Sequence, residues 1–360
     1  MENPGGTRTV HQMSPSTRFT HLTLNAIPAT LLSVTILLSL SSRDVSVEAE
    51  EKNDALKRNP ADIEAIVRLQ VFLDQAEFTP GRIDGSLGQF TFKALALYRE
   101  AHGIPLSPPI KSDESNPDSL PDVSDIDLAA TPTFTLYTVT ESDLANIGEL
   151  PDNVADQAKS EAMTYRSAAE SVAEKFHTDV NFLEELNPGK TGDIQAGDTL
   201  SVPNVKPFEL SAVTKGSVES TESNTNTTFV RINTGTSMLT VYEGEKLIAA
   251  YPVTIGSGQT ESPVGDWKVT EISGMPNFRY DKSMLKEGIR SDNFHMLPPG
   301  PNNPVGVLWI QLNKSGIGMH GTSEPETIGR SSSHGCVRLA NWDVVRLAAR
   351  ITAGVPVEIH

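Results

Sequence analysis

The sequence contains a single cysteine, Cys336, among its 360 residues. A chain with one cysteine cannot form an internal disulfide, so its fold must be stabilised by ordinary hydrophobic cores. The length allows about two or three domains of ordinary size. Because the thiol has no cross-linking partner within the chain, its neighbours in the sequence indicate what it does.

Cys336 lies in the sequence Ser-His-Gly-Cys, and His320 lies sixteen residues upstream of it. A thiol attacks as the thiolate, so it needs an imidazole nearby to take its proton. His334 would share one face of an extended segment with Cys336. The backbone N–H groups of Gly335 and Cys336 are placed to stabilise an oxyanion. The pattern therefore predicts a nucleophile, a base and an oxyanion site.

His-Gly-Thr at 320–322, followed by Ser-His-Gly-Cys-Val-Arg-Leu at 333–339, resembles the signature of L,D-transpeptidases with a YkuD-type catalytic domain. This signature is long and specific. The catalytic residues that the resemblance implies are Cys336 as nucleophile, His320 as base, Gly321 as the carbonyl that orients the imidazole, and His334 with Gly335 at the oxyanion site. No cofactor and no metal are expected.

Four further residues are predicted to bind substrate, and they are Arg338, Ser333, Trp309 and Tyr280. Arg338 stands where the family has Arg or Asn, and a surface ion pair is an alternative role for it. The segment 278–304, which contains Tyr280, is predicted to cover the substrate.

The cysteine has two alternative interpretations. A lone cysteine is most often a small buried hydrophobic residue, but the flanking Ser-His-Gly argues against that role here. Imidazole and thiolate are also zinc ligands, so His320, His334 and Cys336 are an alternative metal site. That alternative lacks a closely spaced ligand pair such as His-x-x-x-His or Cys-x-x-Cys.

Residues 1–49 are predicted to be a secretory signal peptide or an uncleaved membrane anchor. A mostly apolar run at 24–40 follows a polar start, charged residues return at Arg43, and 47–49 offers a small-residue cleavage site. The run is short and interrupted for a stable membrane-spanning helix. We therefore expect an exported protein of the periplasm or cell envelope.

Residues 58–106 are predicted to form a small helical domain, because apolar residues recur at spacings of three and four on both sides of a Gly-rich turn. The loop sequence Ile-Asp-Gly-x-Leu-Gly resembles that of peptidoglycan-binding domains, and an ordinary helical hairpin is the alternative. Residues 107–133 are rich in Pro, Ser and Asp, which predicts a linker.

Residues 134–205 resemble a LysM module, whose βααβ fold binds glycans that contain N-acetylglucosamine. An alternating segment at 134–140 predicts a strand, 167–186 a helical region, and 194–203 a turn and a second strand. The stretch between Val139 and Ser167 is longer than a LysM module normally has, so a structural spacer is an alternative to glycan binding. Residues 206–227 are predicted to be a second linker.

Residues 228–360 are predicted to form the catalytic domain. Alternating apolar segments and a hairpin turn at 243–246 predict strands. Asn341 is expected to cap a helix that is followed by a closing strand at 355–359. The resemblance implies a β-sandwich-like, mostly antiparallel fold. The whole chain is thus predicted to be multidomain, with a mainly β catalytic domain after a helical domain and a βααβ module.

The function that the resemblance implies is acyl transfer on peptidoglycan. The enzyme would cleave a stem tetrapeptide before its terminal D-Ala and pass the acyl group to an amine, giving a 3–3 cross-link, D-amino acid exchange or lipoprotein attachment. An L,D-carboxypeptidase and a non-catalytic wall-binding protein are the alternatives. Expected partners are stem peptides, glycan strands and carbapenem β-lactams. The 46 acidic residues against 29 basic ones argue against nucleic acid.

Overall fold

The computed structural model describes residues 59–105, 120–218, 227–256, 262–331, 333 and 335–360. These residues belong to one compact unit, Arg58–His360. The predicted signal peptide or anchor at 1–49 lies outside the described residues. Within the described part of the chain, no helix is long and apolar enough to cross a membrane.

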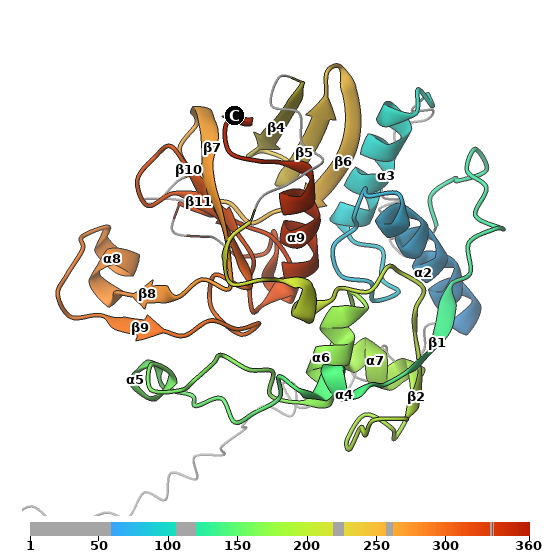
Figure 1. The fold of residues 1–360 in the computed structure, drawn as a ribbon. Helices are drawn as coiled ribbons and strands as arrows, with labels where there is room; N and C mark the ends of the chain where they lie inside the picture. The colour runs from blue at the N-terminus through green and yellow to red at the C-terminus, as the bar shows by residue number, and fades with distance from the viewer. Residues whose placement is uncertain (1–58, 106–119, 219–226, 257–261, 332, 334) are drawn as a thin grey trace, which may run out of the picture. The chain divides into compact units, whose positions relative to one another are not determined.

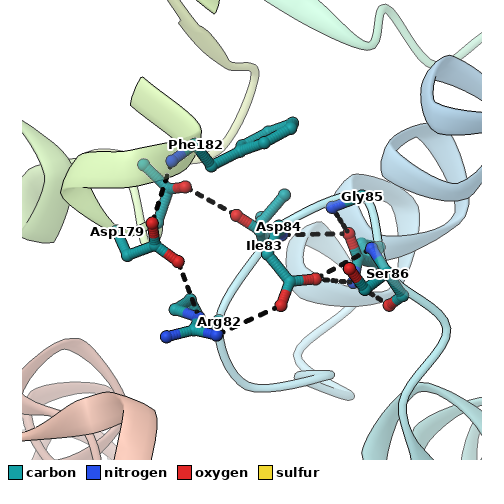
Figure 2. Close-up of polar contacts among 9 residues, drawn as sticks. Arg82, Ile83, Asp84, Gly85, Ser86, Asp179 and Phe182 are labelled. Atoms are coloured by element: carbon teal, nitrogen blue, oxygen red, sulfur yellow. Dashed lines mark hydrogen bonds and ion pairs between the residues drawn. The ribbon is translucent and has the colours of Figure 1, made fainter. Parts of the chain in front are cut away.

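The first two helices are α2 (Pro60–Gln75) and α3 (Gln89–Ala101), as the apolar periodicity predicts (Figure 1). The loop between them is held by polar contacts with Gln70 of helix α2 and with Asp179, further along the chain. Gln70 Oε1 accepts hydrogen bonds from the backbone N–H of Asp84, at 3.3 Å, and of Gly85, at 3.1 Å. Arg82 lies between the carboxylates of Asp84, at 3.4 Å, and Asp179, at 2.9 Å (Figure 2). These contacts give the loop a structural role, and glycan binding by it stays a prediction.

The next elements are β1 (Phe134–Thr138), α4 (Glu141–Leu144), α5 (Val154–Gln157), α6 (Ala168–Lys175), α7 (Val180–Leu186) and β2 (Thr199–Pro203). Strands β1 and β2 pair antiparallel. The predicted helical region at 167–186 is divided in two because His177 adopts a left-handed φ of 56°. Its ring Nδ1 lies 2.9 Å from Asp74 Oδ2, so the break turns His177 toward helix α2.

The catalytic region is built on a nine-stranded sheet among the described residues, with strand order β12-β11-β10-β7-β13-β4-β5-β6 and β3 paired to β7. The strands are β3 (Gly216–Ser217), β4 (Thr228–Asn233), β5 (Met238–Glu243), β6 (Lys246–Pro252), β7 (Gly265–Gly274), β10 (Leu308–Leu312), β11 (Gly318–His320), β12 (Val337–Arg338) and β13 (Pro356–Ile359). Pairs β11–β12 and β13–β4 are parallel, and the other pairs are antiparallel. Two short 3₁₀ helices are η1 (Leu210–Ala212) and η3 (Pro325–Thr327).

The two ends of this sheet meet. Thr254, just after β6, exchanges two backbone hydrogen bonds of 2.9 Å with Arg338 of β12. Buried side chains from both ends, such as Tyr251 of β6 and Val337 of β12, therefore share one core. One curled sheet, rather than two separate ones, encloses the sandwich-like core that the sequence predicts.

Helix α9 (Asn341–Arg350) contributes Trp342, Val344 and Leu347 to the same core. The prediction that Asn341 caps this helix is wrong, because the cap position is Ala340 and no side chain caps the helix there. Asn341 is instead the first residue of the helix and is fully buried. Its amide is therefore used in tertiary contacts, described below.

Strands β8 (Phe278–Tyr280) and β9 (His295–Leu297), with α8 (Lys282–Glu287) between them, form a hairpin that projects from the sheet (Figure 1). We call residues 278–297 the flap. Asp281 organises it by accepting from the backbone N–H of Ser291, at 2.7 Å, and from Arg279, at 2.6 Å. Leu150 and Met163, from the long stretch between α4 and α6, pack against Leu297 of the flap. That stretch is therefore bound to the catalytic region.

A buried ionic cluster also joins distant parts of the chain. Asp74 of α2 is fully buried and makes two contacts with Arg346 of α9, at 2.8 and 3.1 Å. His177 contacts the same carboxylate, and its ring stacks on Trp342 with centroids 5.2 Å apart. Burial alone would raise the pKa of Asp74, but Arg346 and His177 outweigh it and hold the pKa well below its usual range.

Candidate active site

Parallel strands β11 and β12 bring the two halves of the sequence motif together. Met319 pairs with Val337, and His320 pairs with Arg338. Met319 and Val337 are fully buried in the core. Because side chains alternate along a strand, His320 and Arg338 face the opposite side of the sheet. Cys336, one residue before Val337, lies on that side as well.

A cavity of about 240 Å³ opens on this side. Six residues that the sequence predicts for the site line it, and they are Cys336, His320, Arg338, Ser333, Trp309 and Tyr280. The flap contributes the apolar side chains of Phe278, Met284 and Leu285 to the lining. Gly321 and Gly335 lie next to the lining residues in the chain, and His334 lies outside the described residues.

His320 is held in a defined orientation. Its side chain is buried, and Nδ1 lies 2.6 Å from the carbonyl oxygen of Gly321, which is the contact that the resemblance implies. Since a carbonyl only accepts, Nδ1 must carry the proton, and Nε2 is left with a lone pair. The indole of Trp309 stacks on the imidazole, with centroids 5.3 Å apart and planes 13° apart. The arrangement leaves Nε2 as the basic atom of the ring.

Trp309 and Ser333 contact neighbouring protein groups as well as lining the cavity. The indole N–H of Trp309 donates to Gln311 at 3.0 Å. The hydroxyl of Ser333 donates to the carbonyl oxygen of Cys336. The backbone N–H of Ser333 donates to the carbonyl oxygen of Ile255 at 2.9 Å. Ser333 thus stabilises the turn before the cysteine, and its role in substrate binding stays a prediction.

Cys336 is half-buried, and its Sγ lies 3.5 Å from the carbonyl oxygen of Gly316, to which the S–H can donate. Burial raises the pKa of the thiol, while a backbone hydrogen bond from Gly318 and the charge of Arg338 oppose that rise. The thiol is therefore protonated at neutral pH.

Burial, with a smaller contribution from the nearby charge of Arg338, lowers the pKa of His320 to about 4, although the hydrogen bond to Gly321 opposes the change. The imidazole is therefore neutral at neutral pH. Together with the protonated thiol of Cys336, it forms a neutral pair rather than a thiolate–imidazolium pair. The proton has to move during the attack, which makes His320 suited to general-base catalysis.

Arg338 brings a positive charge to the cavity. Its side chain is half-buried, and none of the carboxylates in the described ranges forms an ion pair with it. The alternative of a surface ion pair is therefore not observed among these residues. A guanidinium facing a cavity is suited to binding a carboxylate by paired hydrogen bonds.

Other residues of the site were not singled out from the sequence. Arg279 and Asp281 line the cavity and hold the flap, and the helix-capping position of Asp281 before α8 is the signal that could have identified it. Gly318 and Gly321 are needed for close packing. A Cβ atom on Gly318 would lie 2.7 Å from Trp309, and one on Gly321 would lie 2.1 Å from Asn341 Oδ1.

The metal alternative depends on residues that the structure describes only in part. Among the described residues, no three His, Cys, Asp or Glu side chains come together in a way that could hold a metal ion. His334, the third ligand of that alternative, is not among them. His320 is already oriented by Gly321 through Nδ1.

Comparison with known proteins gives the family. The family model of the L,D-transpeptidase catalytic domain, YkuD, matches residues 227–359. The L,D-transpeptidase homologue YqjB of Bacillus subtilis is 31% identical over 136 residues, which cover 36% of this chain and 70% of the relative. The chain belongs to the L,D-transpeptidase family. The family and the enzyme class predicted from the sequence are confirmed.

Other similarities of this L,D-transpeptidase are more distant. The homologue YkuD of Bacillus licheniformis is 27% identical over 196 residues, which cover 53% of this chain and 92% of the relative. A solved L,D-transpeptidase from Mycobacterium smegmatis is 14% identical, with a TM-score of 0.31 and coverage of 37% of this chain and 58% of that one. L,D-transpeptidase 3 from Mycobacterium tuberculosis, solved with a faropenem-derived adduct, is 13% identical, with a TM-score of 0.31 and coverage of 47% and 76%.

Proposed function

We propose that this L,D-transpeptidase acts on the stem peptides of peptidoglycan, with Cys336 as nucleophile and His320 as base. One observation carries the proposal. The half-buried thiol and an imidazole whose Nδ1 is fixed by the Gly321 carbonyl line the same cavity. With Nδ1 protonated, Nε2 carries the lone pair that can accept the thiol proton, and covalent cysteine catalysis requires such a base near the nucleophile.

In the first half of the reaction, Cys336 Sγ attacks the carbonyl that precedes the terminal D-Ala, and His320 Nε2 takes its proton. An S–C bond forms, and the oxyanion is stabilised by backbone N–H groups at Gly335 and Cys336. The C–N bond then breaks, and the amine of D-Ala leaves with the proton from His320. A thioester of the shortened stem peptide remains on the enzyme.

In the second half, an amine attacks the thioester and gives its proton to His320 Nε2. An N–C bond forms and the S–C bond breaks, and His320 returns the proton to the sulfur of Cys336, which restores the neutral pair. A diamino-acid side chain of another stem would give a 3–3 cross-link. A free D-amino acid would give exchange, and a lysine of a lipoprotein would give attachment. Water as the acceptor would make the enzyme an L,D-carboxypeptidase, which is the second candidate within the same chemistry.

The surroundings of the cavity support this class of substrate. Arg338 supplies a cation that suits a carboxylate of the stem peptide, and Tyr280 with the apolar residues of the flap supplies a surface for its side chains. Intact Cys336 and His320 argue against a non-catalytic wall-binding protein. We also propose that the protein is exported to the periplasm or cell envelope, where this substrate is found.

The direct test is incubation of the full chain with a disaccharide-tetrapeptide, followed by mass spectrometry of the products. We expect loss of terminal D-Ala together with a cross-linked dimer, or with an exchanged residue when a D-amino acid is added. Release of tripeptide alone would identify a carboxypeptidase. Recovery of unchanged tetrapeptide would contradict both proposed reactions.

The pH dependence should reflect the neutral pair. Acylation by a carbapenem should stay constant as the pH falls from 7 to about 5 and decline only near pH 4, because burial keeps His320 unprotonated down to that range. Alkylation of Cys336 by iodoacetamide should keep rising with pH beyond the ordinary thiol pKa of about 8.5, because burial raises the pKa of this thiol. Stopped-flow acylation and timed alkylation across this pH range measure the two effects.

Unfolding must be followed over the same pH range as a control. The unfolded state binds a proton at His320 near pH 6.5 but the folded state only near pH 4, so this histidine makes the fold less stable as the pH falls through that window. An acylation rate that declines near pH 6.5 while the protein stays folded would contradict the lowered pKa of His320, and a thiol that titrates below pH 7 would indicate a thiolate–imidazolium pair instead.

A further inference from the structure

A carboxylate of the 134–205 module reaches the catalytic region. Glu174 lies in helix α6, and its side chain is nine-tenths buried. One carboxylate oxygen accepts a hydrogen bond of 2.8 Å from the amide nitrogen of Asn341, the first residue of α9. The other accepts from the hydroxyl of Tyr165 in the same module. Glu174 therefore connects α6 to the start of α9.

Asn341 fills the space between two tight turns of the catalytic region. Its Oδ1 accepts from the N–H of Val307 at 3.1 Å, and its Nδ2 also lies 3.3 Å from the carbonyl of Pro301. A Cβ atom built on Gly306 or on Gly321 would lie 2.1 Å from the same Oδ1. Since nothing larger than glycine fits against this amide, both turns pack directly on it, and a shift of the amide toward either glycine would displace that turn.

The Gly321 turn is the one that orients the catalytic imidazole. The Gly321 carbonyl accepts from Nδ1 of His320 at 2.6 Å, and its N–H donates to Leu308 at 3.2 Å. The carbonyl of His320 accepts from the N–H of Leu339 at 2.8 Å. A continuous set of contacts thus runs from Glu174 through Asn341 and Gly321 to His320.

We propose that Glu174 is a positioning residue for the active site, which acts through Asn341 to fix the Gly321 turn and thereby the orientation of His320. The inference rests on the proposed role of His320 as the base. An ionised carboxylate only accepts hydrogen bonds, so it holds the Nδ2 side of the Asn341 amide toward the module and the Oδ1 side toward Val307 and the two glycines. The 134–205 module is then a structural support of the catalytic site, whatever else it binds.

The electrostatics of Glu174 indicate which substitutions are informative. Burial raises the pKa of its carboxyl to about 7, although the hydrogen bonds from Tyr165 and Asn341 oppose the rise. In the protonated form, the carbonyl oxygen still accepts from Asn341 and the hydroxyl can donate to Tyr165. The shape of the Glu174 side chain and its hydrogen-bond acceptor for Asn341 therefore matter for this contact, rather than its charge. A glutamine at this position retains both.

The test compares three substitutions at this position by the rate of carbapenem acylation. Glu174→Ala removes the acceptor, and Glu174→Asp withdraws it by one methylene. Both should slow acylation by roughly tenfold to a hundredfold, the range expected when a catalytic group is displaced by up to about 1 Å. Glu174→Gln should stay within about threefold of the wild type. If Glu174→Ala fails to fold, the contrast between Glu174→Asp and Glu174→Gln still tests the inference.

Asp143→Ala is the matched control, because Asp143 is a buried carboxylate of the same module whose contacts are with Tyr137, Thr140 and Lys175 and not with Asn341. It should lower the melting temperature but leave the acylation rate unchanged at temperatures where the protein is folded. Equal loss of rate in Asp143→Ala and Glu174→Ala would overturn the inference, because the effect would then be one of module stability.

A second measurement does not depend on acylation. In the spectrum of protein with ¹⁵N-labelled histidine, the Nδ1–H signal of His320, assigned by its absence in His320→Gln, should be protected from exchange in the wild type and in Glu174→Gln. In Glu174→Ala and Glu174→Asp it should exchange faster. An unchanged signal together with a wild-type rate would overturn the positioning role. A wild-type protein that shows the signal but no acylation would contradict the proposed function alone.

Discussion

Replacing Cys336 with alanine should abolish both acyl transfer to amines and covalent addition of a carbapenem, while the protein stays folded. Cys336 is the only thiol in the chain and lines the same cavity as His320. Removal of an attacking nucleophile typically lowers the rate by about 10⁴-fold or more. The side chain is small and half-buried, so its loss should cost little stability. Product analysis on tetrapeptide and intact-protein mass after carbapenem treatment measure the two losses.

Cys336→Ser is the matched variant, because it keeps the size of the side chain and loses only the thiol. It should also be inactive, since a single neutral imidazole does not generate a comparable alkoxide from serine. The wild type should gain the mass of one carbapenem, and neither variant should gain it. An adduct that persists in Cys336→Ala would place the covalent chemistry on another residue.

Removing one partner of the buried ionic cluster should lower the free energy of unfolding more than any of the other proposed substitutions. Asp74→Ala leaves Arg346 and His177 without their shared carboxylate, and Arg346→Met leaves the buried carboxylate with His177 alone. Breaking a buried ion pair in this way costs about 3–5 kcal/mol, because the remaining charge stays desolvated. The free energy of unfolding, from urea denaturation, should decrease by about that amount in each variant.

Glu64→Ala provides the control on the same helix, since Glu64 forms an exposed pair with Arg68, one turn away, at 2.7 Å. Exposed pairs of this spacing contribute about 0.3–0.5 kcal/mol, so this variant should be nearly neutral. Combining Asp74→Leu with Arg346→Met should recover part of the loss, because the Asp74 carboxylate and the Arg346 guanidinium are then both absent. A single variant at Asp74 as stable as Glu64→Ala would show that the buried contacts contribute nothing net.

The parts of the molecule that follow from the sequence are those with local signals. The helices α2 and α3 follow the spacing of their apolar residues, and the strands flanking 243–246 follow the alternation. The juxtaposition of His320 with Cys336 follows from a specific motif, which the shared cavity matches. Each of these depends on residues within about twenty positions of one another.

The parts that sequence reasoning missed depend on contacts between distant residues. The predicted helical region is interrupted at His177, whose hydrogen-bond partner, Asp74, lies 103 residues away in the sequence. Asn341 has a residue type that often caps helices, yet its side-chain amide donates a hydrogen bond to the carboxylate of Glu174, 167 residues upstream. The curling of the sheet depends on the pairing of Thr254 with Arg338. No local sequence pattern shows these contacts, because the residues that form them come together only when the chain folds.

The buried pairing of Asp74 with Arg346 has a consequence for how such enzymes can be recombined. A catalytic domain excised at the boundary of the family match would lack Asp74, the ion-pair partner of Arg346, and His177, whose ring stacks on Trp342. Fusing that domain to unrelated upstream modules would leave a guanidinium and an indole without their complementary groups. A working chimaera would have to include helix α2 and the loop at His177 together with the catalytic domain. The segment to exchange is therefore defined by this interface rather than by the boundary of the domain.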